Sequence, residues 1–198
     1  IDPVRYIGNR SSGKMGYAIA AAAARRGAKV ILISGPSHLE PPAGVIFKSV
    51  ETTQQMMAAV LDEYDDSHIV IKAAAVADYR PKIAEQHKIK KSSDTLELIL
   101  EKNPDILLEL GKNKKHQILV GFAAETQDLL RYAKGKLEKK NLDMIVANDV
   151  SLPDAGFNVD TNIAKVVYRD GRIDELPKMT KESLAEVILD KIPLTSKI

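Results

Sequence analysis

Apolar and polar positions alternate along the chain in the manner of a protein built from strands and helices in turn. A short apolar run, Val4–Ile7, precedes a polar loop, Gly8–Gly16, and then the alanine-rich segment Tyr17–Arg26. Five consecutive alanines favour a helix, and Gly27 is typical of a helix end. The continuous apolar run Lys29–Ser34 has the length of a buried strand. Together these segments predict a strand–helix–strand unit with a right-handed crossover.

The alternation continues to the end of the chain. Further strands are predicted at Val45–Val50, His68–Val76, Leu96–Leu100, Gln117–Gly121 and Met144–Ala147. Helices are predicted to begin at Thr52, which forms a capping box with Gln55, at Asn103-Pro104-Asp105, at Thr126 and at Thr180. The turn signal Arg169–Arg172 lies between two apolar runs and predicts a hairpin. The pattern predicts an α/β, Rossmann-like fold: a mostly parallel sheet with helices on both faces and a late antiparallel hairpin extension.

The length of 198 residues suits a single domain, which we assign to residues 1–198. One segment, Pro81–Asp94, is polar, carries lysines and has almost no apolar residues. It is long for a passive connector, so we predict a mobile flap at residues 81–94. Because Ile1 is not a translational start, we expect this domain to be cut from a longer chain.

Composition narrows the classes of function. Lys and Arg number 29 against 27 Asp and Glu, a net charge of +2, and aromatic residues are few, so we expect no nucleic-acid partner. The longest apolar stretch, Tyr17–Ala24, is far too short for a membrane span, so we expect no membrane. The absence of cysteine excludes disulfides, thiolate metal sites and a cysteine nucleophile, and fits a cytoplasmic protein. The four histidines lack metal-ligand spacing, and no Gly-x-Ser-x-Gly elbow occurs. With these classes of site excluded, phosphate or nucleotide chemistry remains as the expected function.

The loop before the first predicted helix is the main chemical signal. Gly8-x4-Gly13-Lys14 is close to a P-loop, but Met15 stands where that motif needs Ser or Thr, and the glycine spacing does not fit a dinucleotide fingerprint. Backbone N–H groups at a helix start nevertheless bind anions. The polar residues of the loop would lie at the carboxyl end of a strand, where open α/β sheets bind ligands; they are Asn9, Arg10, Ser11 and Ser12. The alternative is a simple strand-to-helix turn.

Small residues at a second strand end give another candidate surface. Ala73, Ala74 and Ala75 would let a flat ligand rest against the backbone, and Asp78 offers an acceptor. The alternative is that the alanines only pack a crowded sheet and Asp78 caps a turn. Lys72 is unusual in such a strand, because a buried lysine must snorkel or find a partner.

Other cations and one aromatic residue have two interpretations each. Lys88, in the run Lys88–Lys91, belongs either to a solvated surface or to a closing flap that brings a cation to a phosphate. Lys136 and Lys140, four residues apart, form either a solvated face or an anion site. Phe122 ends a predicted strand and lies either in the core or against a base.

Six motifs occur in an order that is specific as a set. They are Asn9–Gly16, Ala74–Tyr79, Lys88–Lys91, Lys102–Ile106, Val120–Thr126 and Ala147–Val150. Over nearly the whole chain, this set resembles the bacterial phosphopantothenate–cysteine ligases, the phosphopantothenoylcysteine synthetase domain of coenzyme A biosynthesis. The resemblance implies that the carboxylate of 4′-phosphopantothenate attacks CTP to give an acyl-cytidylate and pyrophosphate. The amine of L-cysteine then attacks the acyl group and releases CMP.

The resemblance also implies roles for individual residues. Asn9 would act on the acyl intermediate and Lys88 in acyl-cytidylate formation. CTP would contact Ser11, Ser12, Gly13, Lys14, Ala73, Ala74, Ala75, Asp78, Lys88, Pro104, Asp105, Ile106, Leu107, Phe122, Lys136 and Lys140, and phosphopantothenate would contact Arg5, Asn9 and Arg10. Lys72 departs from the family pattern, which has a small residue there.

The family resemblance brings cofactors and partners with it. It implies Mg²⁺, whose ligands the sequence does not assign, a homodimer with Arg5 as a candidate contact, and FMN only in a preceding decarboxylase half. Two other classes stay open on the residues alone. One is a Rossmann-type NAD(P)-binding oxidoreductase, and the other is a non-catalytic nucleotide-binding module.

Overall fold

The fold is that of a computed structural model of the chain, described for residues 1–9, 11–90, 94–125, 129–149 and 161–194. The helices are α1 (Lys14–Arg25), α2 (Thr53–Tyr64), α3 (Ile106–Lys112), α4 (Leu129–Lys139) and α5 (Lys181–Lys191). The strands are β1 (Val30–Ser34), β2 (Val45–Ser49), β3 (Ile69–Lys72), β4 (Tyr79–Pro81), β5 (Leu100–Lys102), β6 (Ile118–Glu125), β7 (Met144–Asp149), β8 (Thr161–Tyr168) and β9 (Ile173–Thr180). No helix among these residues is long and apolar enough to cross a membrane.

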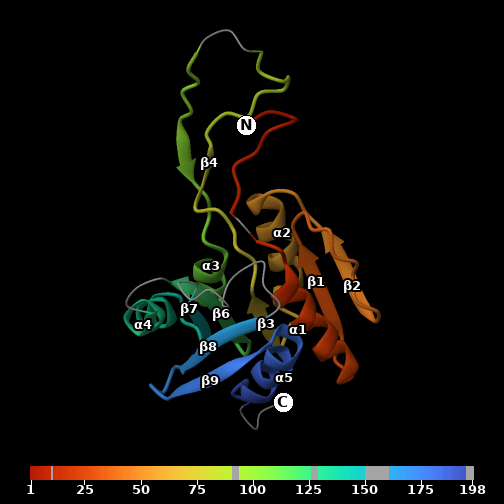
Figure 1. Cartoon of the computed structure of the whole chain (residues 1–198), viewed down its shortest axis with the longest axis vertical. Helices are drawn as coiled ribbons and strands as arrows, with labels where there is room; N and C mark the ends of the chain where they lie inside the picture. The colour runs from red at the N-terminus through yellow and green to blue at the C-terminus, as the bar shows by residue number, and fades with distance from the viewer. Residues whose placement is uncertain (10, 91–93, 126–128, 150–160, 195–198) are drawn as a thin grey trace.

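The main sheet has five strands in the order β3-β6-β7-β8-β9. Strands β3, β6 and β7 are parallel, whereas β8 and β9 form the antiparallel hairpin predicted from its turn signal. Strands β1 and β2 pair in parallel with each other, beside α2 (Figure 1). The α/β prediction with a late hairpin extension is therefore confirmed.

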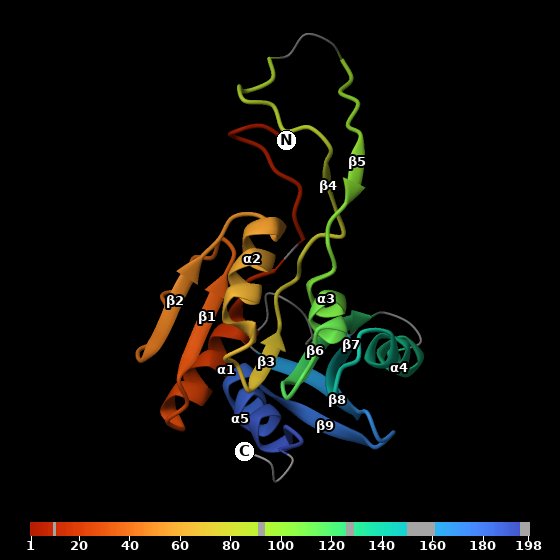
Figure 2. The same ribbon diagram turned by 180° about the vertical axis from the view of Figure 1, so that it is seen from behind.

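Two apolar cores cover the two faces of the main sheet. Ile118 and Val120 of β6 point into the core that includes α1 and α5, and Leu119 between them points into the core of α2, α3 and α4. This alternation is the period-two pattern of a strand buried on both faces. Helices therefore lie on both faces, as Figures 1 and 2 show from front and back.

Local capping chemistry sets most helix starts. Thr52 and Gln55 form the predicted capping box of α2, and the Thr180 hydroxyl accepts from the Ser183 N–H at the start of α5. The α3 helix begins one step later than predicted, because Asp105 is its cap. Pro104 therefore precedes the cap instead of standing in the first turn.

Val4–Ile7 is not a strand, so the prediction of a first strand before α1 is wrong. The side chains of this segment face outward, with Val4 61% and Tyr6 84% exposed, so no sheet neighbour covers them. Instead the N-terminus bonds to residues 85–89: the Glu85 N–H donates to the Ile1 carbonyl, and the Ile89 N–H donates to Asp2 Oδ2.

Residues 82–90 and 94–99, which we name the arm, lie between β4 and β5 in the chain and rise away from the sheet together with the N-terminus (Figures 1 and 2). The antiparallel β4–β5 pair forms its base. The strand predicted at Leu96–Leu100 lies instead at Leu100–Lys102, and that predicted at His68–Val76 ends at Lys72. The arm contains most of the predicted flap, of which residues 91–93 lie outside the described residues; its mobility stays a prediction.

Candidate functional site

A pocket of about 90 Å³ lies at the carboxyl end of β3. Its walls come from the end of β3 and the segment after it, from the start of α3, and from the residue after α4. They are Lys72, Val76, Ala77, Asp78, Asn103, Pro104, Asp105, Ile106 and Lys140. The structure thus brings together four of the predicted CTP contacts on two separate segments, Asp78 and Pro104–Ile106, with Lys140 as a fifth.

Asn103 fixes the shape of this pocket. Its Nδ2 donates to the Ala77 carbonyl at 2.8 Å, and its backbone N–H donates to the Asp78 carbonyl at 2.8 Å. The segment after β3 is therefore tied to the segment before α3. Sequence reasoning missed this role, although Asn before Pro-Asp at a helix start was the available signal.

An ion pair crosses the pocket between Asp105 and Lys140. Lys140 Nζ lies 2.9 Å from Asp105 Oδ2, and Asp105 also caps α3 by accepting from the Leu108 N–H. Burial disfavours the ionised carboxyl, but the hydrogen bonds from Lys140 and Leu108 outweigh it and lower the pKa of Asp105. The carboxylate is therefore charged at neutral pH.

Lys72 is half-buried beside this pair. Its Nζ donates to the Ala74 carbonyl at 2.9 Å. Burial and the nearby charge of Lys140 lower the pKa of Lys72 to about 8, although Asp105 and Asp78 oppose the shift. The charge of Lys136 lowers the pKa of Lys72 slightly further.

We expect Lys72→Met to raise the free energy of unfolding by about 1–2 kcal/mol at pH 7, because it removes a partly desolvated ammonium at the loss of one hydrogen bond. The pKa of Lys72 rises from about 8 to its usual 10.5 on unfolding. The unfolded wild type therefore binds more protons between these pH values, and wild-type stability increases with pH there. The difference in unfolding free energy between Lys72→Met and wild type should therefore be largest below pH 8 and should decrease as the pH approaches 10.5. Urea unfolding at pH 7 and pH 9.5 measures this, and a variant less stable than wild type at pH 7 would contradict it.

The loop before α1 contacts the segment after β3 that lines the pocket. Asn9 Nδ2 donates to the carbonyl of Val76, a pocket residue, at 3.2 Å. A Cβ added to Gly16 would lie 3.8 Å from Ala73 Cβ, so α1 starts against the end of β3. Gly13 ends the loop with φ +75°, a conformation that favours glycine. Ser11 and Ser12 belong to the same loop, and Arg10 lies outside the described residues.

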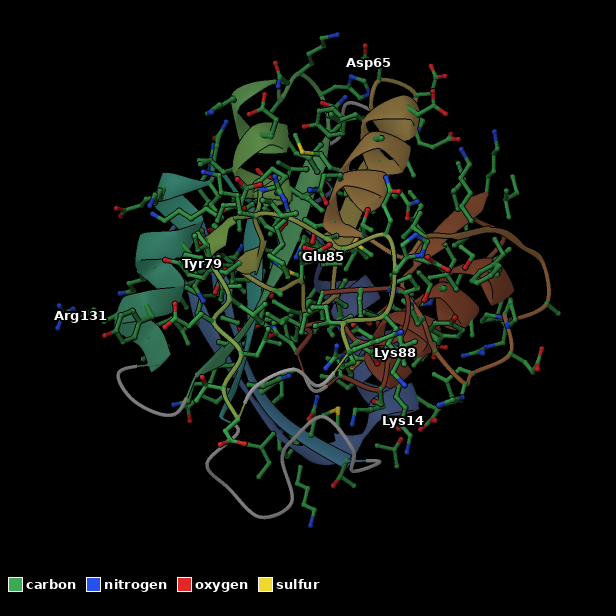
Figure 3. The ribbon with its side chains drawn as sticks, turned by 90° about the horizontal axis from the view of Figure 1, so that it is seen from above. Lys14, Asp65, Tyr79, Glu85, Lys88 and Arg131 are labelled. Atoms are coloured by element: carbon green, nitrogen blue, oxygen red, sulfur yellow. The ribbon has the colours of Figure 1, made fainter. Side chains whose placement is uncertain are left out.

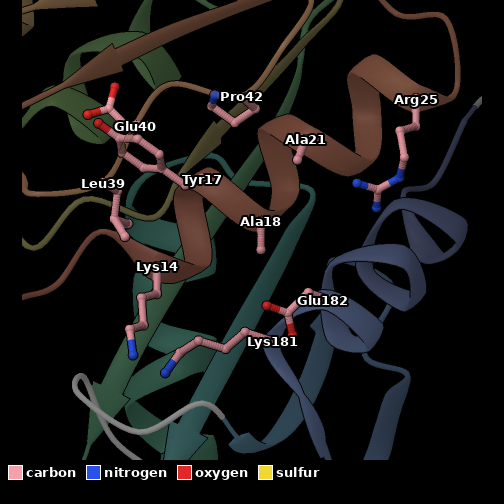
Figure 4. A pocket seen from close by; sticks show the side chains of 10 residues that line it. All are labelled: Lys14, Tyr17, Ala18, Ala21, Arg25, Leu39, Glu40, Pro42, Lys181 and Glu182. Atoms are coloured by element: carbon pink, nitrogen blue, oxygen red, sulfur yellow. The ribbon is translucent and has the colours of Figure 1, made fainter.

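A larger pocket, about 320 Å³, lies along α1 (Figure 4). Lys14, Tyr17 and Arg25 line it from α1, and Lys181 and Glu182 line it from α5. The side chains of Lys14 and Lys181 extend toward each other at one end. Of these residues, only Lys14 was predicted as a site residue from the sequence. Lys181 is only 4% exposed, and the sequence did not indicate it because a lysine at the start of a helix is typical of the surface.

The structure holds Lys88 and Arg5 on the arm side, apart from the β3 pocket. Arg5 pairs with Asp2 and donates to the Ile89 carbonyl, and the Arg5 guanidinium holds the pKa of Asp2 well below its usual range. Seen from above, Lys88 lies over the same side of the molecule as Lys14 (Figure 3). Along the long axis, however, the arm stands clear of the sheet (Figure 1).

Two predicted nucleotide contacts also pack in or against the cores. Leu107 is buried among α2, α3 and α4, and Phe122 packs against the core of α1 and α5. Phe122 therefore lies on the opposite sheet face from Leu107. Within the described part of the chain, no three His, Asp or Glu side chains cluster to hold a metal ion.

Comparison with known proteins gives consistent matches. A family model described as "DNA/pantothenate metabolism flavoprotein C-terminal domain" matches residues 1–194. "Coenzyme A biosynthesis bifunctional protein CoaBC" of Bacillus subtilis is 54% identical over 198 residues, which are 100% of this chain and 49% of that protein. The protein of the same name from Escherichia coli K12 is 49% identical over 97% of this chain and 48% of its own length. The chain thus spans about half the length of these relatives.

Solved structures share the fold. The crystal structure of the C-terminal domain of coenzyme A biosynthesis bifunctional protein CoaBC superposes with a TM-score of 0.82 and 47% identity, covering 97% of this chain and 87% of that one. The DNA/pantothenate metabolism flavoprotein from Streptococcus pneumoniae has a TM-score of 0.81 and 26% identity, covering 97% and 92%.

Proposed function

The chain belongs to the DNA/pantothenate metabolism flavoprotein C-terminal domain family, and from this membership we propose that it is a CTP-dependent phosphopantothenate–cysteine ligase of coenzyme A biosynthesis. The observation that carries the proposal is the pocket after β3, which gathers Asp78, Asp105 and Lys140 and is contacted by Asn9 through Val76. The names of relatives at 54% and 49% identity place them in the same biosynthesis.

The proposed reaction has two steps. A carboxylate oxygen of 4′-phosphopantothenate attacks the α-phosphorus of CTP, and pyrophosphate leaves. The amine of L-cysteine then attacks the acyl carbon, CMP leaves with that oxygen, and an amide remains. Both steps develop negative charge that fixed amide donors and cations stabilise.

Asn9 suits the second step because its Nδ2 donates to the carbonyl of Val76, a residue that lines the proposed nucleotide pocket. The Val76 carbonyl already orients its Nδ2 there, and an amide N–H can donate to the carbonyl oxygen of the acyl group as cysteine attacks. The loop Ser11–Lys14, with Arg10, would hold the phosphates. Ala73–Ala75, Leu107, Phe122 and Lys136 complete the proposed CTP site by resemblance.

Lys88 suits the first step if the arm bends toward the sheet. It lies over the same side as Lys14, so closure along the long axis would bring its ammonium to the triphosphate (Figure 3). We also propose a homodimer, supported by exposed apolar side chains on and beside the arm, including Tyr6, Ile83 and Ile99. Arg5 and the phosphopantothenate site would then lie near the partner subunit.

Mg²⁺ fits this site as an ion that enters on the triphosphate. Magnesium in such sites is bound by substrate phosphates with one or two carboxylates, so a protein-built cluster is not required. The ion would neutralise charge on the phosphates.

Pyrophosphate release tests the proposal. With phosphopantothenate and Mg²⁺, CTP should give pyrophosphate before cysteine is added, ATP should give far less, and cysteine should then yield CMP and the amide. A non-catalytic nucleotide module would bind CTP without releasing pyrophosphate. Thermal protection by NADPH instead of CTP would favour an oxidoreductase.

A further inference from the structure

Lys72 occupies a position that apolar packing does not explain. Val70 and Ile71 of β3 pack into opposite cores, and the strand alternation puts Lys72 on the face of Val70, at the point where the pocket opens. The ammonium of Lys72 is close enough to that of Lys140 for the repulsion between them to disfavour the charged form of Lys72. Such a group is typical of a site that a ligand completes.

The hydrogen bonding of Lys72 leaves capacity for a ligand. An ammonium has three donors, and among the described residues the Ala74 carbonyl is the acceptor that its Nζ reaches. The neighbouring Asp105 carboxylate is already engaged by Lys140 and by the Leu108 N–H. Two donors of Lys72 can therefore turn to an acceptor inside the pocket.

The charges around Lys72 favour a neutral ring over a phosphate. The pocket lining carries two ammonium groups, Lys72 and Lys140, and two carboxylates, Asp78 and Asp105, so its formal charges balance and it offers no net attraction to a phosphate. A nucleobase edge is uncharged and carries both acceptors and donors. Cytosine presents a carbonyl oxygen, which an ammonium can bind, and an exocyclic amino group, which a carboxylate can accept.

We propose that Lys72 is a specificity-determining residue of the nucleotide pocket, whose ammonium donates a hydrogen bond to the carbonyl oxygen of a pyrimidine base. The proposal rests on the proposed function and names how that site selects its nucleotide. Adenine has no carbonyl oxygen, so ATP leaves the ammonium without this partner. Uracil keeps a carbonyl but lacks the amino group, which places UTP between CTP and ATP.

Calorimetric titration of CTP, UTP and ATP into wild type, Lys72→Met and Lys72→Gln at pH 7 tests this selection. Loss of a hydrogen bond from a charged donor should weaken CTP and UTP about 10–100-fold in Lys72→Met, while ATP changes less than about 3-fold. Lys72→Gln keeps an uncharged donor and should lose less than Lys72→Met. Lys48→Met, which removes a lysine of β2 paired with Glu63, is the control and should bind all three like wild type.

The pH dependence of CTP binding gives an independent readout. Four charged groups act on Lys72, and all remain in Lys72→Met: Asp78 after β3, Asp105 at the cap of α3, Lys136 in α4 and Lys140 just after α4. Because the charged form binds the base, the dissociation constant for CTP should rise as pH passes 8 in wild type, by up to tenfold per pH unit. The rise should be absent in Lys72→Met.

The outcomes separate the two proposals. If wild type releases pyrophosphate from CTP but Lys72→Met and Lys72→Gln bind the three nucleotides as wild type does, Lys72 has no role in selection and the inference is overturned. If Lys72→Met weakens the binding of CTP, UTP and ATP by the same factor, Lys72 attracts nucleotides in general, and its proposed role in base selection is overturned. A wild type that binds CTP poorly and releases no pyrophosphate overturns the proposed function itself. Cytidine weakened by the same factor as CTP would support contact with the base, and unchanged cytidine affinity would contradict it.

Discussion

Replacing Asn9 with alanine is expected to leave acyl-cytidylate formation intact and to slow its reaction with cysteine about 10²–10³-fold, so that the intermediate accumulates. The reason is geometric. Asn9 reaches the pocket through the Val76 carbonyl, 3.2 Å from its Nδ2, and alanine removes the amide that would stabilise the developing oxyanion. Rapid-quench assays with labelled CTP separate the two steps.

Lys88→Ala should show the opposite pattern in the same assay, with no detectable acyl-cytidylate. Its ammonium is the cation that the arm would bring to the phosphates during the first step. Lys82→Ala is the matched control, because Lys82 is also an exposed lysine of the arm and should be dispensable. Normal amide formation in both Asn9→Ala and Lys88→Ala would refute these assignments.

Gly111→Ala is expected to destabilise the fold by about 3 kcal/mol or more, since overpacking against backbone has no cheap relief. An alanine Cβ at this buried position of α3 would lie 2.0 Å from the Lys140 carbonyl oxygen. The Lys140 backbone must move, and the Lys140–Asp105 pair across the pocket with it. Urea unfolding and CTP titration should therefore both show a loss.

Gly135→Ala is the matched control in α4. Nothing lies within 4 Å of the added Cβ, and alanine is the better helix former, so stability should rise by about 1 kcal/mol. A Gly111→Ala protein as stable as wild type would show that α3 and the end of α4 do not make this close approach.

Local signals in the sequence predicted most of the fold. Thr52 with Gln55, Thr180 and the Arg169–Arg172 turn act through neighbouring residues, so their helices and hairpin could be read directly. Val4–Ile7 has the composition of a strand but no sheet neighbour, and a strand needs a partner distant in sequence. That partner cannot be inferred from the run itself.

The candidate site could be predicted only in part, because some of its contacts depend on segments that are distant in sequence. Asp78 follows β3 as expected, but among the described residues no strand precedes the loop of Asn9, so the argument from shared strand ends holds for Asp78 alone. The loop reaches this place through the hydrogen bond from Asn9 Nδ2 to the Val76 carbonyl. The contact of Lys72 with the Ala74 carbonyl and the Asp105–Lys140 pair depend on how α3 and α4 pack, which no local pattern encodes. Lys88 was placed on the predicted flap from the sequence, and its role was assigned by resemblance. The structure adds that the arm carrying it stands clear of the sheet (Figure 1).

The fate of the substrate carboxylate oxygen tests the central proposal most directly. Phosphopantothenate labelled with oxygen-18 in its carboxylate is incubated with CTP, Mg²⁺, cysteine and the protein, and the nucleotide product is analysed by mass spectrometry. Attack on the α-phosphorus predicts CMP that carries one labelled oxygen, together with unlabelled pyrophosphate. Label found in inorganic phosphate, with CDP as the nucleotide product, would contradict an acyl-cytidylate intermediate.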